Sequence, residues 1–316
     1  MAAFVLVLGL VACTSSRDGQ VGSAGKVEVL AGHTDAVVGL TALDDGRLAS
    51  VADDGDIRVW DLTASAVDLT IKAGLSKVAA IDQLQDGRLI TASPSGAEIW
   101  DLWPAPAPVR IPDSRSTYSV AVLSDGTIAA GDANGTVRIW NPNDLAEPLV
   151  AYQQHTAAGR PGALVNDVVE LSDGTIASSA AGEVHIWDRR RPMQTLAASG
   201  PMQRELFSIT ELSDGWFASA GTNGWVYLWD TSQPNSNQLG FPEPGFYTDT
   251  DVIELERDLV ASRGNHVWLW SPSEPSKALA AYERDNSTAL ALLPDGRLAV
   301  GYYDGEIHLW DPGLGS

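Results

Sequence analysis

A tryptophan returns at nearly constant intervals along most of the chain and closes each of seven similar segments. These tryptophans stand at positions 60, 100, 140, 187, 229, 270 and 310, so the successive spacings are 40, 40, 47, 42, 41 and 40 residues. A period of this length is typical of folds in which one small supersecondary unit is repeated and each unit packs on its neighbours. The chain is therefore expected to fold as an array of seven units.

Each unit consists of short apolar runs separated by turns. Six units contain an Asp-Gly pair between two apolar runs, as in LDDGRLAS, whereas the sixth has LERDLVAS, with Glu256 in place of the turn aspartate. Asp-Gly between strand-forming residues is a strong hairpin signal, because both central residues of a tight hairpin turn need a positive φ. A second turn precedes each tryptophan and a weaker apolar stretch follows it. Four short antiparallel strands per unit are predicted, and the fold class is all-β.

The repeated units resemble WD40 repeats over roughly residues 26 to 312. The resemblance is closest in GHTDAVVGLTALDDGRLASVADDGDIRVWDL, which begins with the Gly-His pair and ends with the Trp-Asp pair of that family. It implies a seven-bladed β-propeller with one four-stranded antiparallel blade per repeat. It also implies a structural hydrogen-bonded set in the first blade, formed by His33, Ser50, Asp54 and Trp60.

The last unit supplies three strands up to Trp310, and a spare strand-like segment, KVEVLAG at residues 26–32, precedes the first complete unit. Pairing of this segment with the last blade would remove two exposed sheet edges and close the ring. We therefore expect the N-terminal strand to complete the seventh blade.

The first residues of the chain differ in composition from the repeats. Residues 2–13 read AAFVLVLGLVAC, an apolar run that is too short to span a bilayer but fits the hydrophobic region of a signal peptide. Its last four residues, Leu10-Val11-Ala12-Cys13, resemble the lipobox of bacterial lipoproteins, in which the cysteine is lipidated. Cys13 is also the only cysteine of the chain.

This second resemblance implies three segments: a signal peptide over 1–12, a lipidated Cys13 with a flexible tether over 13–25, and the propeller over 26–316. It implies a protein that is lipid-anchored outside the cytoplasm in a bacterial cell envelope, in the outer membrane of a Gram-negative cell. The alternative is a cytoplasmic scaffold whose N-terminus is not processed.

Charge and motifs exclude several classes of function. With 20 Lys and Arg against 41 Asp and Glu, the formal net charge is −21, which repels nucleic-acid phosphates, so no nucleic-acid partner is expected. The sequence contains no G-x-S-x-G elbow, no H-E-x-x-H motif and no paired cysteines. No catalytic residue, cofactor or metal site is predicted. His185 and His308 both lie two residues before a repeat tryptophan, which favours a shared structural role.

The favoured function is a membrane-anchored, non-catalytic scaffold that binds an unknown protein or peptide. The alternative is an extracytoplasmic hydrolase or lyase that uses the central channel, since fold alone does not decide function. For such an enzyme, the sequence offers only Asp167 and Asp251 as candidate titratable groups in the channel.

Strand direction predicts which face of the ring meets the membrane. A tether that enters the first strand at Lys26 emerges on the face that carries the Asp-Gly turns and the loops after each tryptophan. Local attraction to anionic headgroups would favour the basic residues of that face. The candidate membrane-facing residues are Arg47, Arg88, Arg189, Arg190, Arg191 and Arg297. The alternative is that these arginines only balance nearby turn aspartates.

The opposite face is then the expected partner-binding face. It gathers aromatic residues around the second turns and carboxylates near the channel mouth, a combination that suits a partner with basic residues. The candidate partner-binding residues are Asp167, Trp225, Tyr247, Asp249, Asp251, Tyr302 and Tyr303. The alternative is that the aromatic side chains pack between loops and the aspartates only cap turns.

Overall fold

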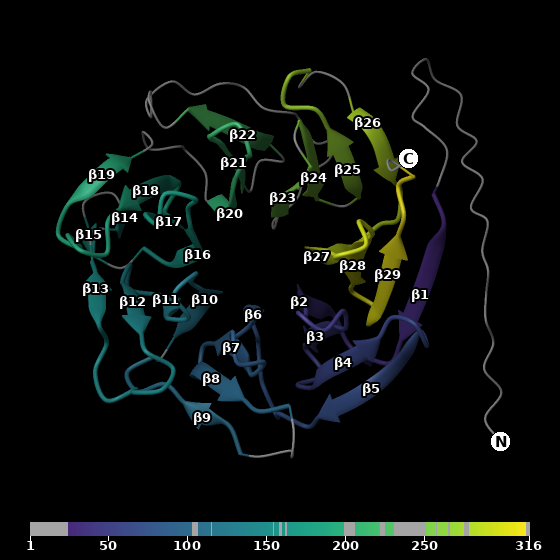
Figure 1. The fold of residues 1–316 in the computed structure, drawn as a ribbon, viewed down its shortest axis with the longest axis horizontal. Coiled ribbons are helices and arrows are strands. Elements are labelled where there is room, and N and C mark those ends of the chain that lie inside the picture. Colours follow the sequence, from purple (N-terminus) through teal and green to yellow (C-terminus); the bar gives the residue numbers. More distant parts are fainter. Residues whose placement is uncertain are drawn as a thin grey trace.

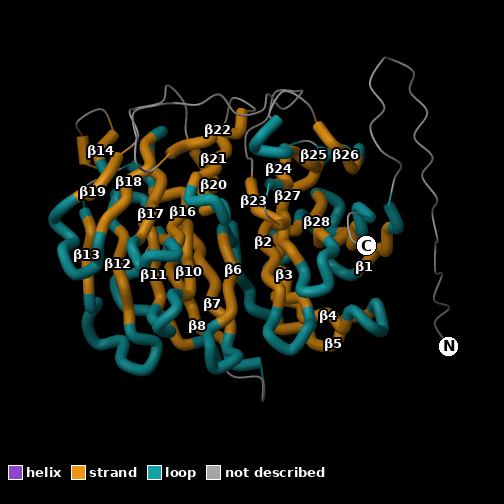
Figure 2. The backbone as a smooth tube through the Cα atoms, turned by 45° about the horizontal axis from the view of Figure 1, so that its top comes forward, coloured by secondary structure: helices purple, strands orange, loops and turns teal. Residues whose placement is uncertain are grey.

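A computed structural model of the chain shows seven antiparallel sheets arranged as blades around a central axis (Figure 1). The structure describes residues 25–102, 107–114, 116–153, 155–157, 160–161, 163–198, 206–221, 225–230, 251–256, 258–264, 266–274 and 278–313. These residues form strands, turns and loops and contain no helix (Figure 2). That part of the chain contains no helix long and apolar enough to cross a membrane. The prediction of an all-β, seven-bladed propeller is confirmed.

The first strand of each blade lies nearest the axis. These inner strands are β2 (Val37–Ala42), β6 (Ala80–Gln83), β10 (Thr117–Val122), β16 (Val165–Glu170), β20 (Leu206–Glu211), β23 (Asp251–Glu256) and β27 (Ser287–Leu292). The second strands are β3 (Leu48–Ala52), β7 (Leu89–Ser93), β11 (Ile128–Asp132), β17 (Ile176–Ala180), β21 (Trp216–Gly221), β24 (Leu259–Arg263) and β28 (Leu298–Tyr302).

Each third strand carries the repeat tryptophan at or near its end. The third strands are β4 (Ile57–Asp61), β8 (Gly96–Trp100), β12 (Val137–Trp140), β18 (Glu183–Trp187), β22 (Trp225–Asp230), β25 (Val267–Trp270) and β29 (Glu306–Trp310). The outer strands are β5 (Ala66–Ile71), β9 (Val109–Arg110), β13 (Val150–Tyr152), β19 (Thr195–Ala198), β26 (Ala278–Tyr282) and, for blade 7, β1 (Val27–Ala31). A small ribbon of β14 (Thr156–Ala157) and β15 (Arg160–Pro161) lies between blades 3 and 4 in sequence.

The Asp-Gly turns join inner and second strands, but their geometry differs from the predicted one. In blade 1, Gly46 has a φ of 86° and donates its N–H to the Leu43 carbonyl at 2.9 Å, while Asp45 is not among the residues with positive φ. Leu43 in turn donates to the Arg47 carbonyl at 2.8 Å. This pattern is a three-residue loop with one left-handed glycine, so the expectation of two positive φ values was wrong.

Blade 6 has a shorter turn, in which Glu256 pairs directly with Leu259. Asp258, with a φ of 62°, occupies the left-handed position that glycine takes elsewhere. The assignment of Glu256 as the counterpart of the turn aspartate is therefore corrected, because Glu256 belongs to β23 itself.

Apolar side chains pack between neighbouring blades. One buried cluster, for example, joins Val51 and Ile57 of blade 1 to Ile81 and Leu89 of blade 2. In blade 1 every residue of β3 is buried, as expected for a strand with blades on both sides. Each fully buried Leu, Val or Ile contributes about 1.5–3 kcal/mol, so the ring is held by the contacts between blades.

The N-terminal strand closes the ring, as predicted. β1 pairs antiparallel with β29, with Val27 opposite Trp310 and Ala31 opposite Glu306, and the two strands lie side by side in Figure 1. Lys26 accepts a backbone hydrogen bond from Asp311 at 3.0 Å. The start of β1 therefore lies on the face of the Asp-Gly turns, which we call the Asp-Gly face; the face of the second turns is called the second-turn face.

Candidate functional site

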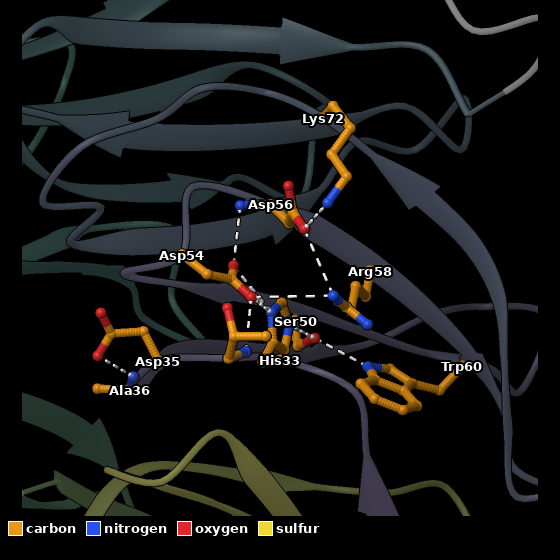
Figure 3. Close-up of polar contacts among 10 residues, drawn as sticks. His33, Asp35, Ala36, Ser50, Asp54, Asp56, Arg58, Trp60 and Lys72 are labelled. Atoms are coloured by element: carbon orange, nitrogen blue, oxygen red, sulfur yellow. Dashed lines mark hydrogen bonds and ion pairs between the residues drawn. The ribbon is translucent and has the colours of Figure 1, made fainter.

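The four residues of the predicted hydrogen-bonded set in blade 1 lie together (Figure 3). Trp60 donates its Nε1–H to the Ser50 hydroxyl at 2.8 Å, and Ser50 lies 2.7 Å from Nε2 of His33. Nδ1 of His33 lies 2.9 Å from the Asp54 carboxylate. Because a carboxylate only accepts, Nδ1 carries the proton and Nε2 accepts from Ser50.

Burial lowers the pKa of His33 although the neighbouring Asp54 opposes that shift. The imidazole is therefore neutral at physiological pH. The hydroxyl of Ser50 is 0% exposed, so this set is closed to a substrate. Its role is to join the His33 loop, the second strand and the tryptophan of one blade.

The contact between tryptophan and hydroxyl recurs in most blades. Five tryptophans donate to a Ser or Thr of the second strand, in the pairs Trp60–Ser50, Trp100–Thr91, Trp187–Ser178, Trp229–Ser219 and Trp270–Ser262. The equivalent positions are Ala130 in blade 3 and Val300 in blade 7. Within the described part of the chain, the Nε1 groups of Trp140 and Trp310 are buried without a partner.

His185 and His308 occupy equivalent places, as expected. Nδ1 of His185 lies 2.9 Å from the hydroxyl of Tyr152 in the preceding blade, and Nδ1 of His308 lies 2.6 Å from the hydroxyl of Tyr282. Burial lowers the pKa of both histidines, that of His308 to about 4. These neutral, enclosed imidazoles join one blade to the next.

A second kind of contact between blades was missed by the sequence analysis. Glu211, at the end of β20, accepts a hydrogen bond from the Ser172 N–H of the preceding blade at 2.6 Å and from the Ser172 hydroxyl at 2.7 Å. The same contact is made by the pairs Gln83–Asp44, Glu170–Ser124 and Glu254–Ser213. We call these the seam contacts.

The seam contacts have a weak sequence signal. The acceptor usually stands three residues before the turn aspartate, as Glu211 does before Asp214, and the donor stands one residue before it. At the seam between blades 7 and 1 these positions are Pro294, which has no N–H, and Ala42, which has no acceptor side chain. A seam contact cannot form there.

The two channel carboxylates have structural partners. Asp167 accepts from the Ile209 N–H of the next blade at 2.7 Å and from the Val168 N–H at 2.8 Å. Burial, with a smaller effect from the charge of Asp251, raises the pKa of Asp167 to about 7. Asp251 forms an ion pair with the buried Arg263 at 2.7 Å. Both groups hold neighbouring strands in place.

The chemistry of the described residues does not favour the channel enzyme. Asp167 could carry a proton near neutrality, but its two oxygens already accept backbone N–H groups. Among the residues that the structure describes, no group of three or more His, Cys, Asp or Glu is placed to hold a metal ion. A polar cleft of about 350 Å³ opens on the Asp-Gly face between blades 2 and 3, where Asp86 and Asp125 line it.

The predicted partner-binding residues lie in different environments. Tyr303 is 68% exposed, whereas the adjacent Tyr302 is only 1% exposed. The guanidinium of Arg284 lies 4.1 Å from the centre of the Tyr302 ring. The prediction that Tyr302 contacts a partner is therefore wrong, because its ring belongs to the core between blades 6 and 7.

The other predicted partner-binding residues do not extend an exposed surface in the described part of the chain. Trp225 is half-buried at the start of β22, where it pairs with Gly221. Tyr247 and Asp249 lie outside the described residues.

Tyr303 stands beside the first loop of blade 1. A Cβ at Gly305, two residues further on, would lie only 2.5 Å from the His33 carbonyl oxygen and 3.1 Å from that of Asp35. The turn of blade 7 therefore packs directly on the loop of blade 1. Asp53, directly after β3 of blade 1, donates its backbone N–H to the Ala36 carbonyl at 2.9 Å and so lies against the same loop.

Exposed carboxylates occur on the loops that meet at this seam. Asp35, Asp53 and Asp304 are exposed, and Asp304 forms an ion pair with Arg284 at 2.6 Å. Partial desolvation, followed by the charges of Asp35 and Asp54, raises the pKa of Asp53, although Lys77 opposes that shift. Asp35 and Asp53 are therefore close enough to repel each other. We call Tyr303, Asp35, Asp53 and Asp304 the Tyr303 patch; it spans the seam between blades 7 and 1 on the second-turn face.

Most of the predicted membrane-facing arginines are already paired. Arg47, Arg88 and Arg297 bind the aspartates of their own turns, at 2.7, 2.7 and 2.8 Å, and Arg189 binds Asp125 of the neighbouring blade at 2.7 Å. This is the arrangement of the alternative interpretation, in which the arginines balance turn aspartates. Arg190 and Arg191 are the two exposed exceptions.

Comparison with known families identifies the repeats. The family described as WD domain, G-beta repeat, matches residues 25–61, 111–141 and 275–311. These segments correspond to blades 1, 3 and 7, the first together with β1. No catalytic family is indicated.

Comparison with curated proteins finds relatives in eukaryotes. Telomerase protein component 1 of Mus musculus is 25% identical over 311 residues, which are 89% of this chain and 11% of that protein. Apoptotic protease-activating factor 1 of Rattus norvegicus is 30% identical over 50% of this chain and 13% of its own length. Target of rapamycin complex subunit wat1 of Schizosaccharomyces pombe is 28% identical over 49% of this chain and 52% of its own length. The chain thus spans from about a tenth to about half of these relatives.

Proposed function

Because this chain is a seven-bladed β-propeller that carries WD40 repeats, we propose that it is a non-catalytic scaffold that binds a protein or peptide. One matched relative is, by its name, a subunit of a complex, which is consistent with this role. The observation that carries the proposal is the Tyr303 patch, where the exposed Tyr303 of blade 7 and the exposed carboxylates of Asp35 and Asp53 of blade 1 meet at one seam.

The chemistry of the patch selects the partner. Aromatic side chains are enriched among the residues that dominate binding energy at interfaces. The carboxylates of Asp35 and Asp53, in a protein of net charge −21, attract cationic groups and repel anionic ones. The proposed partner is therefore a protein segment that carries Lys or Arg beside an apolar residue.

Substitution of Tyr303 by alanine is expected to weaken binding of a short synthetic peptide that alternates arginine and leucine. The expected loss is about 1–3 kcal/mol, the usual range for an aromatic anchor. Asp35→Asn with Asp53→Asn should also weaken binding, with a smaller dependence on salt than the unmodified protein shows. Fluorescence anisotropy of the labelled peptide measures both effects, and the melting temperature should stay nearly constant because Tyr303 is exposed.

A matched control separates the patch from the charge of the whole protein. Asp44→Asn with Glu147→Gln removes the same charge from exposed positions on the Asp-Gly face and should leave peptide binding almost unchanged. Equal losses in the control and patch variants, or normal binding by Tyr303→Ala, would exclude the Tyr303 patch as the site.

The proposed location is a bacterial cell envelope, with the scaffold held to the membrane by a lipid on Cys13. Support comes from the lipobox-like Leu10-Val11-Ala12-Cys13 and from Thr14, rather than Asp, at the next position, which resembles outer-membrane lipoproteins of Gram-negative cells. Cys13 lies outside the described residues. The paired arginines weaken the idea that the Asp-Gly face itself adheres to lipid, so the anchor depends on Cys13 alone.

Replacement of Cys13 by serine is expected to abolish incorporation of radioactive palmitate and to release the protein from the membrane fraction. The unmodified chain, expressed in the same bacterial cells, is the reference. Equal labelling of the two proteins would show that Cys13 is not the lipid attachment site.

A further inference from the structure

The loop that follows Trp187 is built to present two arginines and a methionine. Asp188 accepts the N–H of Arg190 on its carboxylate at 2.8 Å and the N–H of Arg191 on its backbone carbonyl at 2.8 Å. Gln194 then donates its N–H to the Arg191 carbonyl at 2.9 Å. These three bonds order residues 190–193, Arg-Arg-Pro-Met, which we call the 190–193 loop. Little conformational entropy is then lost when the loop binds a partner.

The preceding arginine fixes the loop to the neighbouring blade. Arg189 extends to the Asp125 carboxylate in the Asp-Gly turn of blade 3, at 2.7 Å. The charge of Arg189 is therefore paired within the protein. Arg190 and Arg191 are exposed, and within the described part of the chain no carboxylate lies within ion-pair distance of them. Both guanidinium groups are charged at any physiological pH, so a local cationic site stands on an otherwise acidic protein.

Apolar groups lie on the same face. Met193 is 78% exposed, the largest value among the large hydrophobic residues that the structure describes, and Leu149, before the outer strand of blade 3, is 60% exposed. Arg and Met are among the residues enriched at protein interfaces, and here both kinds occur on one ordered loop.

We propose that the 190–193 loop docks an acidic protein segment that carries apolar residues, with carboxylates on Arg190 and Arg191 and an apolar side chain on Met193. This site lies on the Asp-Gly face, opposite the Tyr303 patch, so it goes beyond the proposed function. The scaffold then has two binding surfaces of opposite charge preference on its two faces.

A membrane is the less favourable occupant of this loop. An anionic bilayer gives about 1 kcal/mol for each basic residue near its surface, and this loop offers two arginines that have no ion pair with the described residues. A planar surface would also meet the turn aspartates of the same face, among them Asp173 and Asp214, which are exposed. A narrow peptide meets the loop alone, because other charges are screened beyond about 8 Å at physiological salt.

The test uses a short synthetic peptide that alternates glutamate and leucine, measured by fluorescence anisotropy at physiological salt with the full chain. Arg190→Glu with Arg191→Glu should weaken binding at least tenfold, which corresponds to about 1.4 kcal/mol or more. Met193→Ser should weaken binding several-fold without changing its salt dependence. The matched control is Lys26→Glu with Lys77→Glu, which makes the same change of net charge at two exposed positions and should alter binding less than about twofold.

The proposal is overturned if the unmodified protein does not bind the peptide, if the double arginine variant binds normally, or if the lysine control loses as much affinity. Vesicles of phosphatidylserine and phosphatidylcholine are the second probe, and arginine-dependent binding to vesicles without peptide binding would assign the loop to the membrane. Tyr303→Ala should leave this peptide's affinity unchanged, so failure here is distinct from failure at the Tyr303 patch.

Discussion

Deletion of residues 26–31, which include all of β1, is expected to lower the melting temperature by about 10 °C or more. β1 contributes the backbone ladder to β29 and the fully buried Leu30. Each ladder bond contributes about 0.5–1.5 kcal/mol and Leu30 about 1.5–3 kcal/mol, so the total is about 5 kcal/mol. Without β1, the edge of β29 is also open to pairing with other chains.

Calorimetry or circular dichroism at increasing temperature measures this effect. Val29→Ala serves as the control, because Val29 is 39% exposed in the same strand and its truncation leaves the ladder intact. A deletion variant that melts like the full chain would show that the ring does not depend on closure by β1.

Ser50→Ala is expected to lower the free energy of unfolding by about 2–6 kcal/mol. The hydroxyl of Ser50 accepts from Trp60 and donates to His33, and all three groups are buried. Its removal leaves two buried polar atoms without partners, each at a cost of about 1–3 kcal/mol. Denaturant unfolding measures the difference.

Blade 3 allows the opposite substitution, which adds a hydroxyl beside the repeat tryptophan. Ala130 occupies in blade 3 the position of Ser50, and the Nε1 group of Trp140 beside it is buried without a partner among the described residues. Ala130→Ser should therefore raise the free energy of unfolding by about 0.5–1.5 kcal/mol. If Ser50→Ala were neutral and Ala130→Ser destabilising, the hydroxyl would not be the group that satisfies these tryptophans.

The features predicted from the sequence are those that repeat. The tryptophan spacing located seven blades, and the spare strand before His33 indicated how the ring closes, because an unpaired edge at Trp310 has few other partners. One error came from turn chemistry. Asp45 and Gly46 look like a two-residue turn, but the pairing of Ala42 with Leu48 shows a longer loop.

The candidate site depended on contacts that a repeat pattern does not contain. Tyr302 and Tyr303 are neighbours with the same side chain, and only the end of β28 at Tyr302 decides which ring is buried. The pairing of Arg189 with Asp125 joins residues 64 positions apart in sequence. The seam contacts were equally hidden, because a glutamate at the end of an inner strand looks like an ordinary solvated residue.

The seam between blades 7 and 1 is where the N-terminal strand joins the last blade. Pro294 and Ala42 cannot form a seam contact, and the junction depends instead on β1, on the Glu28–Arg297 ion pair at 3.0 Å and on the hydrogen bond from the Thr288 hydroxyl to the Val37 carbonyl. The seams between blades 2 and 3 and between blades 6 and 7 also lack an acceptor, because Val122 and Leu292 take that position. What distinguishes the junction of blades 7 and 1 is that the ring is closed there by the noncovalent pairing of β1 with β29, so release of β1 would open the ring while every seam contact keeps its partner. The Tyr303 patch contains residues of both blade 7 and blade 1, so a ligand bound there would hold the ring closed.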